Sequence, residues 1–465
     1  MSGRETVKLA AHNAGMNAQP TPASLYAEHL ATLQERAAAA LNAQGFDGMV
    51  IAAGVEKYTF LDDRSYNFQV NPHFVHWLPL TQTPGSWLLV QPGRRPQLVY
   101  LQPEDYWHAP PAAPSGYWTA QLDVHVVRTP EAAEQLLRQQ APARCAQIAE
   151  QDAALDLGEL NPVGLLNHLH YERAYKTPYE LALMRQASQR AVLGHLAAKA
   201  AFEAGGAEAD IHAAYLAASD QAERELPYGN IVGLGAHGAV LHWQFQDKTA
   251  PAHPTSLLID AGAACKGYAS DITRTWLHPQ AGGAATEFAA VLAGMEELEL
   301  ALVDEVRNGT DYPAIHLSAH QRIAALMLER GLIHGLSAEA AVAQGLTATF
   351  FPHGIGHLLG AQVHDVAGLH TDRQGTRRER PEGHPYLRLT RRLEPGMVVT
   401  IEPGLYFIPM LLRERQASSL ANLVNWPLVE QLLPFGGIRI EDDVACTESG
   451  APENLTRDAF AALAG

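Results

Sequence analysis

Short apolar runs alternate with amphipathic stretches over the first third of the chain. Apolar residues recur at helical spacing near residues 24–41, which predicts a helix, and Gly48-Met-Val-Ile-Ala52 predicts a short strand after it. The alternation continues with strands near 87–90, 97–101, 124–127 and 146–150 and helices around 130–140 and 157–169. Alternating strands and helices favour an α/β fold. We therefore predict an N-terminal α/β domain over residues 23–169.

Longer helical patterns dominate from residue 170 onward. Thr177, Pro178 and Glu180 fit a capping box with proline at the first helical position. The helix that they start keeps one apolar stripe until Gly205-Gly206. Further helices are predicted near 208–223, 285–306 and 313–330, with strand-like runs between and after them. We predict an α+β domain over residues 170–465, in which helices cover an antiparallel sheet.

Two segments fit neither pattern. Residues 1–22 are polar and end in Gln-Pro-Thr-Pro, and we predict a flexible tail there. Phe60–Phe74 is a polar and aromatic stretch too elaborate for a simple connection between strands. It is either a surface loop or a segment that gates a substrate or contacts a second subunit.

Composition and charge exclude several classes of protein. The 465 residues exceed the usual 100–200 of a single domain, and 47% hydrophobic content is ordinary for a globular protein. A formal charge of −17 argues against a nucleic-acid partner. The cysteines Cys145, Cys265 and Cys446 are odd in number and far apart, so we expect neither a disulfide framework nor a thiolate metal site, and a cytoplasmic location. No apolar run approaches the roughly 20 residues of a membrane span, so no membrane contact is expected.

Histidines and glycines crowd into the stretch Phe351–Asp365. His353 and His357 stand four residues apart, as on the helix of a zinc protease, but glycines fill the positions between them. Glycine costs about 1 kcal/mol per helix position relative to alanine, so we predict irregular backbone here. A histidine cluster of this kind is as often structural as catalytic. Carboxylates elsewhere in the chain decide the interpretation.

The acidic side chains in question lie on or at the ends of strand-like runs. Asp260 and Asp271 stand symmetrically about Cys265-Lys266, so a hairpin turning there would set the two carboxylates opposite each other. Like charges that face each other repel unless a cation lies between them. Glu402 ends a second apolar run and Glu441 a third, and each of these alone is a weak signal.

Together these carboxylates and a histidine form a ligand set too large for one ion. Four carboxylates bring four negative charges, which two divalent cations neutralise, as in two-metal hydrolases. Ligation by oxygen atoms and a single imidazole suits Mn²⁺ better than a thiol-seeking ion, with Co²⁺ or Zn²⁺ as alternatives.

Asp260, Asp271, His357, Glu402 and Glu441 also carry a family resemblance through their surrounding segments. Asp-Ala-Gly, Ser-Asp-Ile-Thr-Arg-Thr-Trp, Pro-His-Gly-Ile-Gly-His, Ile-Glu-Pro-Gly-Leu-Tyr-Phe and Gly-Gly-Ile-Arg-Ile-Glu-Asp resemble the motifs of the metallopeptidases with the pita-bread fold. More narrowly, the chain from about Leu25 onward is similar to the bacterial Xaa-Pro dipeptidases (prolidases). The resemblance implies a pita-bread C-terminal domain, two divalent metal ions, hydrolysis of dipeptides that end in proline, and a homodimer.

The resemblance also implies a role for each site residue. The residues matching Asp271 and Glu441 bridge both metals, the one matching Asp260 binds one metal, and those matching His357 and Glu402 bind the other. Glu402 is further implied as a proton shuttle, His364 as the group that steadies the tetrahedral intermediate, and His353 as a histidine beside them. The implied substrate-binding residues are His242, Arg388, Tyr228 and Arg439.

Other functions stay open at this point. Aminopeptidase P shares the implied ligands, but the insertion Met410–Phe435, between Glu402 and Glu441, is typical of the dipeptidases. An inactive relative that only binds peptides would be expected to lose ligands, and all are present. An organophosphate-hydrolysing side activity is a third possibility, because attack on tetrahedral phosphorus resembles attack on the peptide carbonyl.

Overall fold

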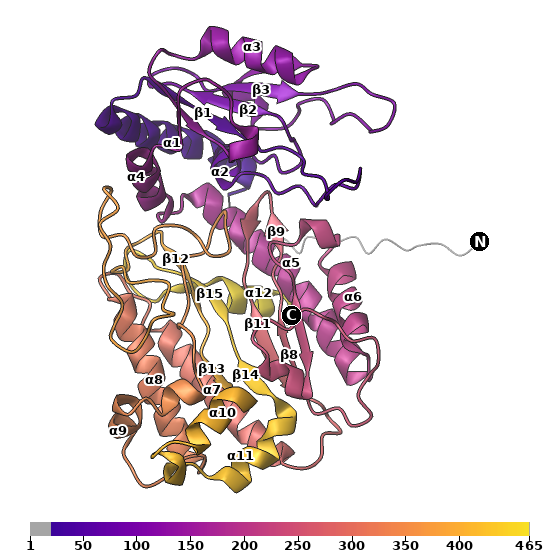
Figure 1. Cartoon of the computed structure of the whole chain (residues 1–465), viewed down its shortest axis with the longest axis vertical. Helices are drawn as coiled ribbons and strands as arrows, with labels where there is room; N and C mark the ends of the chain where they lie inside the picture. Colours follow the sequence, from indigo (N-terminus) through magenta and orange to yellow (C-terminus); the bar gives the residue numbers. More distant parts are fainter. Residues whose placement is uncertain (1–19, 465) are drawn as a thin grey trace, which may run out of the picture.

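The N-terminal domain is organised around a mixed sheet, at the top of Figure 1, in the computed structural model, which describes residues 20–464. The six strands of this sheet run in the order β4-β3-β2-β1-β5-β6. Their bounds are β1 Gly48–Ala52, β2 Trp87–Val90, β3 Gln97–Leu101, β4 Asp123–Val127, β5 Cys145–Ile148 and β6 Glu159–Leu160. β1, β2 and β3 pair antiparallel, whereas β4, β5 and β6 run parallel to their neighbours. The predicted α/β character is confirmed.

Helices cover both faces of this sheet. They are α1 (Pro22–Gln44), α2 (Pro72–Trp77), α3 (Pro130–Gln140) and α4 (Val163–Arg173). Side chains alternate along β1, so Met49 and Ile51 enter a buried cluster with α1, whereas Val50 packs in a second cluster with Leu137 of α3. A strand that is buried on both faces consists of a continuous run of apolar residues, and this is why β1 could be predicted from the sequence.

The structure departs from the predicted loops at two places. Residues 1–19 of the predicted tail lie outside the described residues. At its other end the prediction was too long, because α1 already begins at Pro22. Thr21 is the N-cap of this helix, and its side chain accepts a hydrogen bond from the Ser24 N–H. The helix α2 occupies the end of the segment that we expected to be a loop. Asn71 caps it by accepting a hydrogen bond from the His73 N–H at 3.0 Å. A helix this short has no hydrophobic period to read, so only its cap and Pro72 could have indicated it.

The C-terminal domain places its longer helices on either side of a set of strands. The helices are α5 Pro178–Glu203, α6 Glu208–Ala218, α7 Ala285–Val303, α8 Tyr312–Glu329, α9 Ala338–Ala343, α10 Pro409–Gln416, α11 Trp426–Leu432 and α12 Leu455–Ala464. In Figure 1, α5 and α6 lie on one side of β8, β11 and β15, and α8 lies on the other. The predicted capping box at the start of α5 is present, with Thr177 and Glu180 each satisfying a backbone N–H.

The strands of this domain pair antiparallel, as predicted, but they form several small sheets. They are β7 Ile231–Leu234, β8 Ser256–Asp260, β9 Ala264–Cys265, β10 Tyr268–Ala269, β11 Thr273–Leu277, β12 Val398–Ile401, β13 Gly404–Tyr406, β14 Gly437–Arg439, β15 Asp442–Ala445 and β16 Glu453–Asn454. Their orders are β11-β8-β7, β12-β15-β16, β13-β14 and β10-β9. An isolated bridge between Thr273 and Glu441 connects the first of these sheets to the segment between β14 and β15. Strands far apart in the sequence thus meet near the acidic residues.

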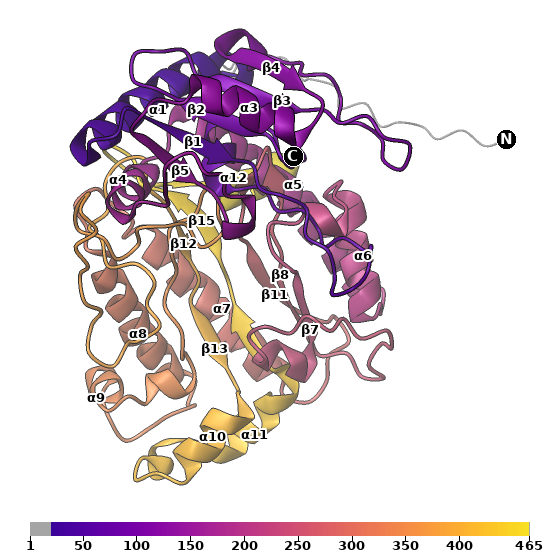
Figure 2. The same cartoon turned by 45° about the horizontal axis from the view of Figure 1, so that its top comes forward.

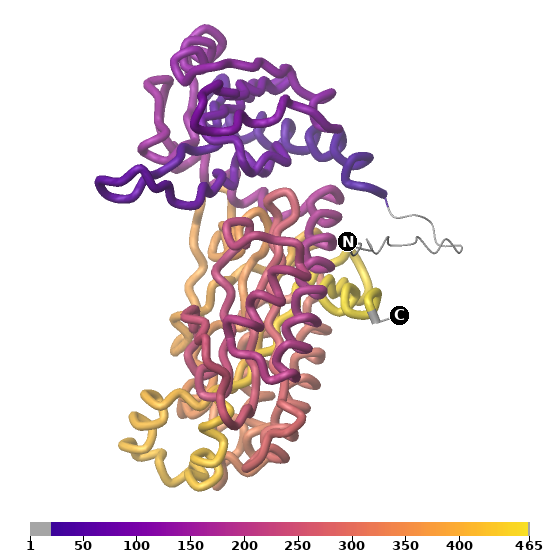
Figure 3. The backbone as a smooth tube through the Cα atoms, turned by 90° about the vertical axis from the view of Figure 1, so that its right-hand side faces the viewer, coloured from indigo at the N-terminus to yellow at the C-terminus, as the bar shows by residue number. Residues whose placement is uncertain are grey.

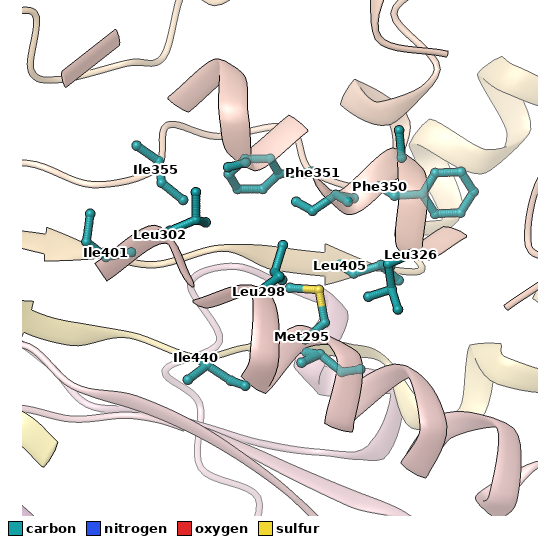
Figure 4. Packing of buried hydrophobic residues seen from close by; sticks show 14 of the residues in the cluster. Met295, Leu298, Leu302, Leu326, Phe350, Phe351, Ile355, Ile401, Leu405 and Ile440 are labelled. Carbon is teal, nitrogen blue, oxygen red and sulfur yellow. The ribbon is translucent and has the colours of Figure 1, made fainter. Parts of the chain in front are cut away.

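A large apolar core fixes this arrangement. Met295, Leu298 and Leu302 of α7 pack against the strand residues Ile401 and Leu405 and belong to one buried cluster (Figure 4). Phe350, directly before the histidine motif, and Phe351 and Ile355, within it, belong to the same cluster. The motif therefore rests on a packed support although its own backbone is irregular. Among residues 20–464, no helix combines the length and the apolar character needed to span a membrane.

The two domains share a buried interface. Figures 2 and 3 show the N-terminal domain stacked on one end of the C-terminal domain. Leu30 and Leu33 of α1 lie in the same apolar cluster as Val398 of β12. At the same junction, Asp365 accepts hydrogen bonds from Arg173 at 3.1 Å (Nε) and from the Lys176 Nζ at 2.8 Å. These charged side chains are almost fully buried, and the Asp365 carboxylate joins the histidine motif to the start of α5.

Replacing Asp365 by asparagine is expected to lower the free energy of unfolding by about 3–5 kcal/mol, because two buried cations lose their counter-charge. Burial alone would raise the pKa of Asp365, but Arg173 and Lys176 outweigh it and the pKa lies well below its usual range. These two ion pairs of Asp365 therefore stabilise the fold above about pH 4, and their contribution is lost as the pH falls below that value. Urea denaturation at pH 7 and pH 3 measures both effects.

The matched control for this variant is Asp47→Asn, which removes an exposed carboxylate that also pairs with an arginine, Arg144. Exposed pairs contribute little to stability. Equal stability losses in the Asp365 and Asp47 variants, or a loss at Asp365 that grows as the pH falls, would contradict the assignment.

Candidate metal centre

A tight hairpin positions the two aspartates, although not as predicted. The hairpin turns at Lys266 and Gly267, which both have positive φ (51° and 89°), and this two-residue turn matches the twist of the flanking strands. The predicted centre was one residue earlier. As a result Asp260 pairs with Thr273, and Asp271 lies two residues before Thr273, just ahead of β11 (Thr273–Leu277). Because side chains alternate, both carboxylates still project from one face, diagonally instead of directly opposite each other.

His357 reaches the same face from the irregular segment after Phe351. Gly356 has a φ of 149°, and a Cβ atom there would lie 2.2 Å from the Thr400 carbonyl oxygen, so only glycine fits. This close approach lets the His357 N–H donate to Thr400 Oγ1 at 3.1 Å. The backbone is irregular, as predicted, and it fixes the ring against the end of β12. His357 Nε2 lies 3.4 Å from the Asp271 carboxylate and 3.8 Å from that of Glu402.

The donor atoms converge from separate strands. Glu402 directly follows β12, and Glu441 lies between β14 and β15. One ligand atom each from Asp271, His357 and Glu441 lie within 4.8 Å of one another. Asp260 is not part of this close group; Tyr228 donates to its carboxylate at 2.7 Å and Arg439 at 2.6 Å. The structure thus brings all of the predicted metal ligands to one place.

Neighbouring side chains orient these carboxylates. Thr273 Oγ1 donates to Glu441 at 2.6 Å, and the Asp271 backbone N–H donates to the Asp443 carboxylate. Arg439 spans the site, because it also donates to Thr273 Oγ1 and to the Tyr406 hydroxyl. Fixed carboxylates of this kind are pre-organised for a cation, and outer partners commonly tune metal affinity 10–100-fold.

The charges of the bare protein do not balance at this site. Burial raises the pKa of Glu402 to about 7, and burial with the nearby acids raises the pKa of Glu441 well above its ordinary range. Burial also raises the pKa of Asp260, and the Arg439 guanidinium offsets only part of this. Burial would raise the pKa of Asp271 too, but the hydrogen bond and charge of His357 lower it. Ionising the whole set requires further positive charge, so the donor set fits divalent cations.

A cavity of about 1270 Å³ opens above these carboxylates. Every predicted substrate-binding and catalytic residue lines it, namely His242, Arg388, Tyr228, Arg439, Glu402, His364 and His353. The His364 ring lies edge-on to His357, with centroids 4.4 Å apart, and is exposed to the cavity. His353 Nε2 contacts the Tyr406 hydroxyl at 2.8 Å, and burial lowers the pKa of His353 to about 3. Residues 69–73 and 148–150 of the N-terminal domain close one side of the cavity.

Glu208 is an organising residue that the sequence did not single out. Its buried carboxylate accepts four hydrogen bonds of 2.7–2.9 Å, from the N–H groups of Leu234 and Asp247, His237 Nδ1 and Trp243 Nε1. These bonds fix the segment on which His242 lies. Tyr406 was likewise missed as a partner of His353 and Arg439, although it belongs to the Gly-Leu-Tyr-Phe stretch after Glu402. Glu208 lies in the first turn of α6 beside Asp210, where acidic residues are common, so it gives no distinctive local signal.

The comparisons with known proteins match both domains. Residues 24–171 match the sequence profile of the Xaa-Pro dipeptidase N-terminal domain, and residues 182–448 match that of metallopeptidase family M24. The chain is 53% identical over 447 residues to the Xaa-Pro dipeptidase of Xanthomonas campestris, covering 96% of this chain and 99% of that protein. It is 50% identical to the Xaa-Pro dipeptidase of Stenotrophomonas maltophilia, covering 96% of this chain and all (100%) of that protein.

Solved structures show the same fold at much lower identity. An aminopeptidase from Pseudomonas aeruginosa superposes with a TM-score of 0.69 at 23% identity, covering 95% of this chain and 96% of that one. Aminopeptidase P from Escherichia coli with the inhibitor Pro-Leu superposes with a TM-score of 0.68 at 23% identity, covering 94% and 95%. These likenesses confirm the pita-bread architecture of the C-terminal domain. The profiles and the full-length identities show that the chain belongs to metallopeptidase family M24, within the group of the bacterial Xaa-Pro dipeptidases.

Proposed function

We propose that this chain is a dinuclear metallopeptidase that hydrolyses Xaa-Pro dipeptides to a free amino acid and proline. The observation that carries the proposal is that one cavity contains both a carboxylate-rich donor set and an exposed arginine that can bind a carboxylate. The relatives at 50–53% identity, which bear the name Xaa-Pro dipeptidase, support it. Prolyl amides have no N–H, so ordinary peptidases handle them poorly and a dedicated pocket is required.

Asp260, Asp271, His357, Glu402 and Glu441 would hold two divalent ions, which when bound polarise the scissile carbonyl and acidify a water molecule. Oxygen-rich ligation favours Mn²⁺ over Co²⁺ or Zn²⁺. Glu402 is the proposed proton shuttle, because its carboxylate faces both His357 and His353 at 3.8 Å on the cavity wall.

The other residues act on the substrate and on the geometry of the ligands. His364 projects into the cavity beside His357 and is proposed to donate a hydrogen bond to the oxyanion that forms on the peptide carbon. His353, held by Tyr406, is proposed to border the leaving proline. Tyr228 and Arg439 both bond to Asp260, so we propose that they orient this ligand and shape the proline side of the pocket.

Arg388 and His242 are proposed to recognise the C-terminal carboxylate of the dipeptide. Both side chains are exposed and line the cavity. Arg388 forms no ion pair with any residue between 20 and 464, so its planar fork is available for a bidentate bond to a substrate carboxylate. A dipeptide has this carboxylate directly after proline, whereas a tripeptide has a neutral amide there. The contact would therefore separate dipeptidase from aminopeptidase activity.

Arg388→Ala is expected to lower kcat/KM for Ala-Pro by about 10–150-fold, the equivalent of about 1.5–3 kcal/mol for a hydrogen bond to a charged group. Turnover of Ala-Pro-Ala, if any, is expected to change far less, because a tripeptide lacks the contact. Steady-state kinetics on both substrates measure the difference. The matched control is Arg392→Ala, since Arg392 is an exposed arginine outside the cavity that pairs with Asp311. Equal losses on the two substrates, or none on either, would assign carboxylate recognition to another residue.

Further properties are proposed on narrower grounds. Phe60 and Leu61 are each 90% exposed, on a loop that projects from the N-terminal domain (Figure 3), and this supports a homodimer. The unpaired cysteines Cys145, Cys265 and Cys446 support a cytoplasmic location. Removal of Xaa from longer peptides is the alternative activity that the Arg388 experiment tests. The organophosphate-hydrolysing side activity stays a prediction.

A further inference from the structure

A second group of histidines lies apart from the carboxylate centre. His316 and His320 are one turn apart on α8, and His384 comes from the irregular segment before β12. His316 Nε2 and His384 Nδ1 are 2.9 Å apart, and the three rings have centroids 4.6–4.8 Å apart. One nitrogen of each ring lies within 4.8 Å of the others.

The hydrogen bonds of this cluster are incomplete. His316 and His320 are each 1% exposed, and neither His316 Nδ1 nor His320 Nε2 has a hydrogen-bond partner among residues 20–464. Leaving buried polar atoms unpaired is costly. The other nitrogen of His320 bonds to Thr347 Oγ1 at 2.9 Å, which orients the ring in the way that an outer partner orients a metal-bound histidine. Burial lowers the pKa of His316 to about 2 and of His320 to about 3, so both rings are neutral and keep a lone pair.

The closest pair of ring nitrogens in this cluster is almost as far apart as two ligand atoms of a tetrahedral metal site. Two imidazoles with metal–nitrogen bonds of about 2.0–2.1 Å at the tetrahedral angle place their nitrogens about 3.3 Å apart. His316 Nε2 and His384 Nδ1 are 2.9 Å apart, so these two nitrogens need to move apart only slightly to bind one ion together. We propose that His316, His320 and His384 form an additional metal site, which binds Zn²⁺ in preference to Mn²⁺. The preference follows from the donors, because neutral imidazoles suit Zn²⁺ and carboxylates suit Mn²⁺.

This site would join the substrate-binding wall to the rigid core. His384 lies in the segment that also contributes Arg380, Tyr386 and Arg388 to the cavity. Phe351 lies between the cluster and the metal centre, with ring centroids 4.9 Å from His320 and 4.8 Å from His353. An ion bound to all three histidines therefore attaches the segment 371–388 to α8. The site's role is to fix the segment that presents Arg388.

Metal content tests the site, independently of the carboxylate centre. The purified full-length chain is stripped with a chelator, refilled with Zn²⁺ and freed of excess ion, and zinc per subunit is measured by inductively coupled plasma mass spectrometry. His320→Gln and His384→Gln are each expected to hold one zinc ion fewer than the parent. The control is His278→Gln, which also removes a buried imidazole with an unpaired nitrogen but lies against Phe202, and it should hold as much zinc as the parent.

Equal zinc content in the parent, His320→Gln and His384→Gln would overturn the proposal. His384 is only half-buried, on an irregular segment, so its variant is expected to fold even if the variant at His320 does not, and circular dichroism checks both. Trypsin provides the second readout. Zinc is expected to slow cleavage at the exposed Arg377 in the parent but not in His384→Gln. Cleavage at the same rate with and without zinc in the parent would contradict the proposed fixation of the segment.

Discussion

Asp271→Asn is expected to lower kcat/KM by more than about 100-fold and to reduce the metal content of the purified enzyme. Changes in groups that merely support a ligand already cost 10–100-fold, and Asp271 is itself proposed to hold both ions. Its carboxylate lies 3.4 Å from His357 and within 4.8 Å of the Glu441 donor, so it is central to the site. Asparagine keeps the shape of the side chain but removes a negative charge and one acceptor. Metal analysis and kinetics on Ala-Pro measure the two effects.

Glu441→Gln is expected to behave in the same way, because Glu441 is the other proposed bridging ligand. Asp304→Asn removes an exposed carboxylate that does not line the cavity and controls for the loss of charge alone. Parental turnover with parental metal content in either site variant would contradict the dinuclear assignment.

The second large effect is expected for His364→Ala, with a 10²–10³-fold lower kcat, a KM that changes little and a full metal content. This is the range for removing one donor to a developing oxyanion. His364 lies edge-on to His357 but is exposed to the cavity and does not belong to the close group of ligand atoms. We therefore expect the substitution to lower kcat and to leave the metal content unchanged.

Metal content separates this role from a structural one. His253→Ala, which removes an exposed histidine that does not line the cavity, is the matched control. A metal-replete His364→Ala enzyme with parental kcat would exclude His364 from the reaction. A variant that loses metal instead would make His364 a ligand or a support for one.

What could be predicted from the sequence was local. The capping box of α5 and the apolar strand β1 can each be recognised from a few neighbouring residues, because caps and buried strands need particular residue types at fixed spacing. The site residues were found because each lies in its own short motif next to a strand end. Their meeting in one cavity then followed from the resemblance to a family.

What could not be predicted depends on contacts between distant residues. The predicted hairpin register was wrong by one position. We inferred the turn from the symmetric placement of the two aspartates, whereas the position of the turn is set by Lys266-Gly267, which adopt the positive φ angles of a two-residue turn. Glu208 gave no signal, since its partners Leu234, His237, Trp243 and Asp247 lie 26–39 residues away. The division into domains at residue 170 and the role of each site residue stay predictions.

The central claim, that this chain is a dinuclear Xaa-Pro dipeptidase, is tested most directly by its choice of substrate. The metal-free enzyme is refilled with Mn²⁺, Co²⁺ or Zn²⁺ in turn, and kcat/KM is measured for Ala-Pro, Ala-Pro-Ala and Ala-Ala. We expect hydrolysis that depends on metal, is fastest with Mn²⁺, and favours Ala-Pro over both other peptides. Faster cleavage of Ala-Pro-Ala than of Ala-Pro would make the chain an aminopeptidase, and no metal-dependent cleavage of any of the three would contradict the account.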